Sequence, residues 1–133
     1  MALALAYGCA LILFVGLDFV WLGTMTPRFY KPTLGDVLLT DVNLKAAAAF
    51  YLFYPIGLVI FVIAPALKSG DVRGALVMGA LYGLFTYGTY DLTNYATLRN
   101  WTAALTATDM VWGAILGAAV SGAVVWGLGK IAL

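Results

Sequence analysis

Apolar residues gather along the chain in four long runs, separated by short polar breaks. Each run comes close to or exceeds the ~20 residues that an α-helix needs to cross the hydrocarbon core of a bilayer. The pattern therefore predicts an all-α, polytopic membrane protein, a bundle of four transmembrane helices in a single domain over residues 1–133. The expected helices cover about residues 3–23, 46–67, 74–98 and 104–129.

The connectors between these runs differ in kind. Residues 24–45 form a long, proline-containing segment, and its apolar cluster of Leu34, Val37 and Leu38 predicts a short helix in the membrane interface. The other two connectors are tight turns. An even number of helices places both termini on one side. Lys and Arg are almost equally divided between the two sides, so the positive-inside rule leaves the orientation open.

Composition agrees with a lipid environment. Hydrophobic residues make up 64% of the 133 residues, the mean hydropathy is +0.99, and only 10% of residues are charged. A soluble domain of this length has too little interior to bury so much apolar surface. The net charge of +1 gives no case for nucleic acid. With no His and with Cys9 as the only cysteine, one chain cannot assemble the usual zinc, haem or iron–sulfur ligands, so neither metal nor cofactor is expected.

Small residues recur at four-residue spacing on the last two helices. Such stripes allow two backbones to approach closely in lipid. Contacts inside the bundle are favoured over a dimer interface. The stripes are Ala75, Gly79 and Gly83, and Gly113, Gly117 and Ser121.

A short repeat links the first and last helices. The sequence Asp-Phe-Val-Trp stands at 18–21, near the end of the first helix, and Asp-Met-Val-Trp stands at 109–112, near the start of the fourth. These helix ends lie on the same side of the membrane. The match is four residues long, so chance competes with a true repeat.

Polar side chains concentrate in one leaflet, on the side of the long connector. Asp18 lies roughly 8 Å and Asp91 roughly 12 Å from the ends of their helices, at 1.5 Å per residue. A carboxylate at such depth costs a few kcal/mol unless it is protonated or meets a cation, and it is a functional candidate by default. The opposite halves of the helices are nearly free of polar groups.

The densest polar segment is the end of the third helix, where Tyr87, Asp91, Asn94 and Tyr95 share one face. If this face meets the aspartates of the first and fourth helices, a pocket of carboxylates, phenols and indoles results. Asp91 and Asp109 are then candidates for catalysis. The expected ligand-binding set is Asp18, Trp21, Arg28, Tyr54, Tyr87, Asp91, Asn94, Arg99, Asp109 and Trp112.

Most of these residues also have a structural interpretation. Asp109, with the threonines before it, is slightly better explained as a cap of the fourth helix. Tyr30, Tyr95 and Trp101 fit an aromatic belt at the interface. Arg28 is as well explained by contact with lipid phosphates.

A structural role explains Asp18 better than it explains Asp91. Asp18 fits equally well as the partner of an arginine, Arg28 or Arg99, and as a functional group. Asp91 with Asn94 has no capping duty at its depth, so a functional role is favoured there.

The sequence resembles a known family at these residues, over nearly its whole length. The resemblance is to a family of small predicted bacterial membrane proteins, a domain of unknown function numbered 2177. It implies a four-helix protein of the bacterial cytoplasmic (inner) membrane and supplies no activity. Thr102 stands where the family usually has proline. The matching residues are Leu17, Asp18, Trp21, Leu22, Gly23, Phe29, Tyr30, Lys31, Tyr54, Gly57, Tyr90, Asp91, Leu92, Thr93, Asn94, Ala96, Thr97, Leu98, Arg99, Asp109, Trp112 and Gly113.

Three functions compete. The first, which we favour, is binding or transport of a small cationic or amphipathic ligand at the polar cluster, through charge and cation–π contacts. The second is an intramembrane enzyme that acts on a lipid or lipid-linked substrate through paired aspartates. The third is an accessory or assembly subunit, in which the cluster only locks the bundle. Membrane lipids are expected partners, and a homodimer or a larger membrane complex is left open.

Overall fold

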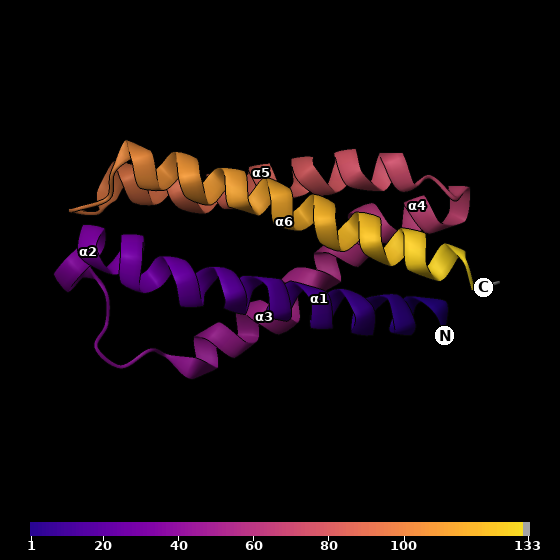
Figure 1. Ribbon diagram of the computed structural model, residues 1–133, viewed down its shortest axis with the longest axis horizontal. Coiled ribbons are helices and arrows are strands. Elements are labelled where there is room, and N and C mark those ends of the chain that lie inside the picture. Colours follow the sequence, from indigo (N-terminus) through magenta and orange to yellow (C-terminus); the bar gives the residue numbers. More distant parts are fainter. Residues whose placement is uncertain (132–133) are drawn as a thin grey trace.

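The computed structural model describes residues 1–131, which fold into four long helices that run alternately in opposite directions (Figure 1). The predicted all-α, four-helix architecture is confirmed. The first helix comprises α1 (Ala2–Met25), a π turn (Thr26–Tyr30), α2 (Lys31–Leu34) and a 3-10 turn (Gly35–Val37). The second comprises α3 (Leu44–Leu58), a π turn (Val59–Ile63) and α4 (Ala64–Ser69). The third and fourth are α5 (Val72–Thr97) and α6 (Ala103–Gly129).

Three of these helices, Ala2–Val37, Leu44–Ser69 and Ala103–Gly129, are long and apolar enough to cross a membrane. The remaining helix, α5, has 26 residues, which span roughly 39 Å at 1.5 Å per residue, but it carries the polar segment. Its short turns join it to a candidate span at each end, so it must return across the same layer. The chain is therefore a helical membrane protein.

The threonines of α5 show how a polar helix is accommodated in this setting. Thr86, Thr89, Thr93 and Thr97 each donate a side-chain hydrogen bond to the backbone carbonyl four residues earlier. This local bond satisfies a hydroxyl group without a partner from another helix. These threonines therefore add little unsatisfied polarity to the surface of α5.

The first helix continues beyond residue 23, where the sequence suggested its end. Pro27 removes a backbone donor, and the chain widens into a π turn in which the N–H of Lys31 bonds to the carbonyl of Thr26. The short segment expected between the first two helices is present as α2, continuous with α1. Its Leu34 is buried rather than spread on the surface. The connector proper shrinks to residues 38–43.

Helices α5 and α6 pack against each other through glycine. A Cβ atom added at Gly83 would overlap the carbonyl oxygen of Gly113, and one added at Gly79 would overlap that of Gly117. Only the missing side chains allow the two backbones to lie so close. The predicted use of these small residues, contacts inside the bundle, is confirmed.

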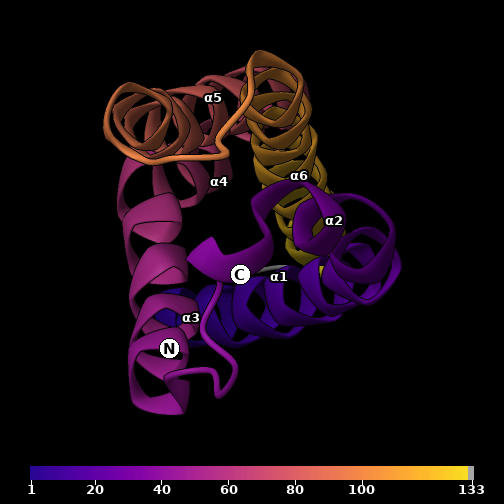
Figure 2. The same cartoon turned by 90° about the vertical axis from the view of Figure 1, so that its left-hand side faces the viewer.

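The second helix crosses the bundle obliquely, as Figure 1 shows from α3 to α4. Its π turn, Val59–Ile63, contacts α1, α5 and α6, whereas α3 packs mainly on α1. Pro55 and the π turn both interrupt regular helix hydrogen bonding, and such breaks permit a change of direction. The helices consequently lie close together near the two termini and stand further apart near the 38–43 connector, which we call the open half of the bundle (Figure 1 and Figure 2).

Candidate ligand-binding site

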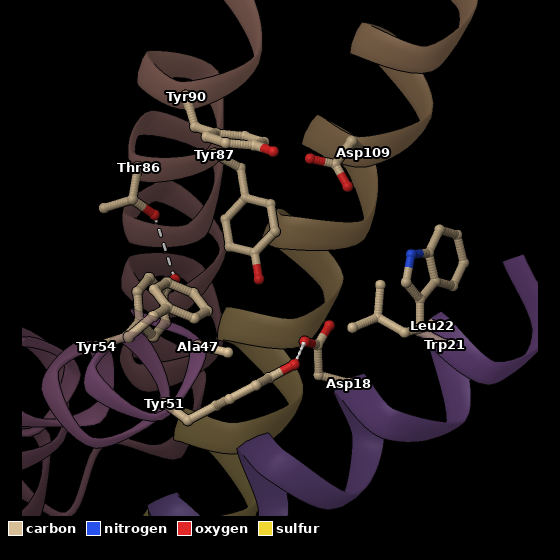
Figure 3. Close-up of a pocket in the computed structure, with 11 residues that line it drawn as sticks. Asp18, Trp21, Leu22, Ala47, Tyr51, Tyr54, Thr86, Tyr87, Tyr90 and Asp109 are labelled. Carbon is tan, nitrogen blue, oxygen red and sulfur yellow. Dashed lines mark hydrogen bonds between the residues drawn. The ribbon is translucent and has the colours of Figure 1, made fainter. Parts of the chain in front are cut away.

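A cavity of about 610 Å³ lies between α1, α3, α5 and α6, in the open half of the bundle. Figure 3 shows its side chains, with Tyr87 projecting into the middle of the space. The lining is largely aromatic and includes two carboxylates. It consists of Asp18, Trp21, Leu22, Ala47, Phe50, Tyr51, Tyr54, Thr86, Tyr87, Tyr90 and Asp109.

Asp18 is held by two neutral donors. Its side chain is 6% exposed, and its two oxygens accept hydrogen bonds from the Tyr51 hydroxyl at 2.6 Å and from the Trp112 indole N–H at 3.1 Å. Neither donor is a cation, so the proposed pairing of Asp18 with an arginine is wrong. The carboxylate is oriented by α3 and α6 and still faces the cavity.

Asp109 is held at the end of a short chain of hydrogen bonds. The Tyr30 hydroxyl donates to its carboxylate at 2.7 Å and accepts the Trp21 indole N–H at 2.9 Å. The interpretation of Tyr30 as an interfacial belt residue is wrong, since its side chain is 9% exposed. The capping interpretation of Asp109 is also wrong, because α6 begins at Ala103 and its cap is the side chain of Thr102.

The short Asp-x-x-Trp repeat meets at the contact between α1 and α6. The rings of Trp21 and Trp112 are stacked, with centroids 4.4 Å apart and planes 2° from parallel. The indole N–H of Trp112 donates directly to Asp18 on the opposite helix. The indole N–H of Trp21 donates to the Tyr30 hydroxyl, which in turn donates to Asp109 on the opposite helix. The two repeats therefore form one continuous contact between the first and last helices.

Asp91 lies behind the cavity wall. Its side chain is fully buried, and no donor among residues 1–131 reaches either carboxylate oxygen. The group that faces it is the carboxyl group of Asp109, at hydrogen-bonding range. A hydrogen bond between two carboxyl groups requires a proton on one of them. Asp91 thus touches the cavity only through Asp109.

The expected set of ligand-binding residues is divided by the structure. Five of its members line the cavity: Asp18, Trp21, Tyr54, Tyr87 and Asp109. Trp112 and Asp91 stand behind them, each in contact with a lining carboxylate. Asn94 is partly exposed and Arg28 and Arg99 are exposed, and these three do not line the cavity.

Several lining residues were not in the expected set. Phe50 and Tyr51 share a face of α3 with Ala47 and Tyr54, at spacings of three and four, so this face was visible in the sequence. Tyr54 stacks on Phe14 with centroids 4.7 Å apart, and its hydroxyl lies 3.2 Å from that of Thr86. Tyr54 is thereby fixed between α1 and α5.

The arrangement suits a positively charged guest. Two carboxylates face a space walled by six aromatic rings, and the lining residues include neither Arg nor Lys. Aromatic faces attract cations through their quadrupoles, by about 0.5–2 kcal/mol per contact. An anion would meet two like charges and find no compensating cation in the wall.

One protein family matches this chain. The family, described as "Predicted membrane protein (DUF2177)", matches residues 3–126. No curated protein sequence matches the chain. No solved structure matches it either. The family description agrees with the helical membrane architecture and names no activity.

Proposed function

Since the chain belongs to the DUF2177 family of predicted membrane proteins, we propose that it binds a small organic cation, or an amphipathic molecule with a cationic group, in the cavity between its four helices. The observation that carries this proposal is the combination of two carboxylates, an aromatic wall and no basic residue around one space of about 610 Å³. Pockets for small molecules commonly have volumes of about 300–1,000 Å³.

The hydrogen bonds of the two carboxylates support this choice of ligand. Asp18 and Asp109 accept bonds from tyrosine and tryptophan, which orient a carboxylate without cancelling its charge. A protein cation in their place would leave nothing for a ligand to neutralise. In an environment of low polarity, a carboxylate with only neutral partners attracts a cation strongly.

The position of the cavity bears on binding and transport. It lies in the half of the bundle near the 38–43 connector, whereas the half near the termini is filled by a closely packed core that includes Leu58, Ile63, Leu116 and Val120. This shape supports binding from one leaflet or one side of the membrane. Transport would require the packed half to open. We place the protein in the bacterial cytoplasmic membrane, in line with its family resemblance.

A matched pair of probes tests the proposal. Benzyltrimethylammonium and neopentylbenzene have the same shape, and only the first carries a charge. Titration into the purified protein in detergent should show saturable binding of the cation, at least about tenfold tighter than that of the neutral isostere. A tenfold ratio corresponds to about 1.4 kcal/mol.

Variants identify the site. Asp18→Asn and Asp109→Asn keep the shape of the side chain and should each weaken cation binding by at least about tenfold, through loss of a charge–charge interaction. Asp41→Asn, at an exposed position on the connector, should leave it unchanged. Equal binding of both probes, or equal loss in all three variants, would refute the proposal. Co-purification with a larger complex and no binding would favour an accessory subunit.

One observation favours an enzyme as the second candidate. Asp91 and Asp109 face each other, and Asp109 lines the cavity. Two carboxyl groups that share a site can act as acid and base on a water molecule. An enzyme that hydrolyses a lipid-linked substrate would lose turnover in both Asp91→Asn and Asp109→Asn. Mass spectrometry of a membrane lipid extract incubated with the wild-type protein and with each variant would detect that loss.

A further inference from the structure

Asp91 has no role in the cavity wall, yet it is the most deeply buried acidic residue of the described chain. Its side chain has no exposed surface, and both oxygens lack a donor. A buried carboxylate without a partner is strongly disfavoured, so it either carries a proton or contacts a group that does. The group in contact is the carboxyl group of Asp109.

Two carboxyl groups in contact cannot both be ionised without strong repulsion, and a single proton between them converts the repulsion into a hydrogen bond. Tyr30 already donates to Asp109, so Asp109 accepts one bond from Tyr30 and can meet Asp91 with its remaining capacity. The geometry thus provides for one proton at the Asp91–Asp109 pair.

Carboxyl and phenol groups from several elements lie around this pair, and the cavity wall that Asp109 lines contains neither Arg nor Lys. From α1, Asp18 acts on Asp109. From the π turn, Tyr30 faces both carboxyl groups. From α5, Tyr87 and Tyr90 line the same cavity wall as Asp109. From α3, the Tyr51 hydroxyl is directed to Asp18 instead.

We propose that Asp91 and Asp109 hold one proton between them and release it when a cation enters the cavity, so that binding exchanges one proton for one cation. This inference rests on the proposed function and specifies how it is driven. The charges balance. Before binding, the pair with its proton carries one negative charge, and after binding, two negative charges and one positive ligand give the same sum. Asp109 connects the two events because it lines the cavity and contacts Asp91.

The exchange predicts a specific behaviour for Asp91→Asn. The amide N–H of the asparagine can donate to Asp109 in place of the shared proton, so the pair no longer has a proton to release. Cation binding should therefore persist in this variant. It should no longer depend on pH in the range where the wild-type pair titrates, and it should no longer release a proton.

The test is a titration of the purified full-length protein with benzyltrimethylammonium in weakly buffered detergent solution that contains a pH indicator. The wild type should release about one proton per bound cation, and its affinity should fall about tenfold for each unit of decrease in pH while the pair keeps its proton. The exposed-site control Asp41→Asn should behave like the wild type. Asp91→Asn should bind with no proton release.

A second measurement needs no ligand. The infrared spectrum of the ligand-free protein should contain the C=O stretching band of a buried protonated carboxyl group, and Asp91→Asn should remove it. Binding without proton release, or equal release from Asp91→Asn, overturns the exchange and leaves the proposed function intact. An absent carboxyl band overturns the shared proton. Absence of any cation binding overturns both the proposed function and the exchange. The wild-type pH dependence decides the matter even if Asp91→Asn fails to fold.

Discussion

The contact between α5 and α6 offers a direct test of the architecture that positions the site. A Cβ atom added at Gly83 would overlap the backbone carbonyl of Gly113. At Gly57, the overlap would be with the hydroxyl of Tyr82, the far end of a half-buried side chain. At Gly16, an added Cβ would meet no atom within 4 Å. The same substitution, glycine to alanine, therefore meets three different obstacles.

These obstacles set the order of the expected effects. Each substitution gains helix propensity of about 1 kcal/mol, and this gain cancels when the variants are compared. Overpacking costs about 1–3 kcal/mol. A backbone carbonyl moves only with its helix, so the cost of overpacking in Gly83→Ala should be near the upper end of this range. Its free energy of unfolding should be about 3 kcal/mol below that of Gly16→Ala. The Tyr82 ring can rotate away, so Gly57→Ala should lie within about 1 kcal/mol of Gly16→Ala.

Reversible unfolding in mixed micelles, followed by tryptophan fluorescence, would measure the free energy of unfolding for all three variants and the wild type. Gly16→Ala also controls for any effect of the micelle on helix propensity. If Gly83→Ala and Gly57→Ala were equally stable within about 0.5 kcal/mol, the limit set by ordinary non-additivity, the two backbones would not approach as closely as described. The position of α6 relative to Tyr87 and Asp91 would then also need revision.

Two further pairs of substitutions probe the end of the bundle near the cavity. Tyr30→Phe removes the donor to Asp109 and the acceptor of the Trp21 N–H, so the free energy of unfolding should fall by about 1–2 kcal/mol; Tyr95→Phe, at an exposed phenol, should change it by less than about 0.5 kcal/mol. Asn100 has a positive φ of 67°, and its side-chain amide donates hydrogen bonds to Leu34 and Asp36 at the end of the first helix. Both Asn100→Ala and Asn100→Gly lose these bonds, but glycine adopts a positive φ without strain, so Asn100→Ala should destabilise the protein more than Asn100→Gly. Thermal unfolding in detergent would rank each pair, and a reversed order in either pair would contradict the corresponding contact.

Local sequence rules were sufficient for the membrane helices and for part of the site. Asp18 and Asp91 could be selected because an acidic residue deep in an apolar run is rare and needs a reason. Tyr54 and Tyr87 followed from the leaflet that they share with the aspartates. These inferences depend only on spacing along one helix and on the alternating direction of the helices, both of which can be obtained from the chain itself.

Other features depend on how helices pack, and here local rules failed. Pro27 is an ordinary signal for the end of a helix, but a π turn carries the chain through it and brings Tyr30 back to Asp109. Three threonines near the start of α6 could each have served as the cap, and only the fold shows that the cap is Thr102 and that the helix begins at Ala103. The neutral partners of Asp18 come from α3 and α6, which no pattern within α1 identifies.

The Asp-x-x-Trp repeat explains how two similar carboxylates come to differ. Spacing of three places Asp and Trp on one face of each helix, and antiparallel α1 and α6 present these faces to each other around the stacked indoles. The hydrogen bonds of the two aspartates are not symmetric. Asp18 accepts one bond from the Trp112 indole and a second from the Tyr51 hydroxyl. Asp109 accepts a bond from the Tyr30 hydroxyl and has an acidic neighbour, Asp91. Hydrogen-bond donors hold a carboxylate in one orientation, and an acidic neighbour favours a shared proton. Two aspartates at equivalent positions of the repeat thus have different surroundings: Asp18 is held by two neutral donors, and Asp109 faces a second carboxyl group.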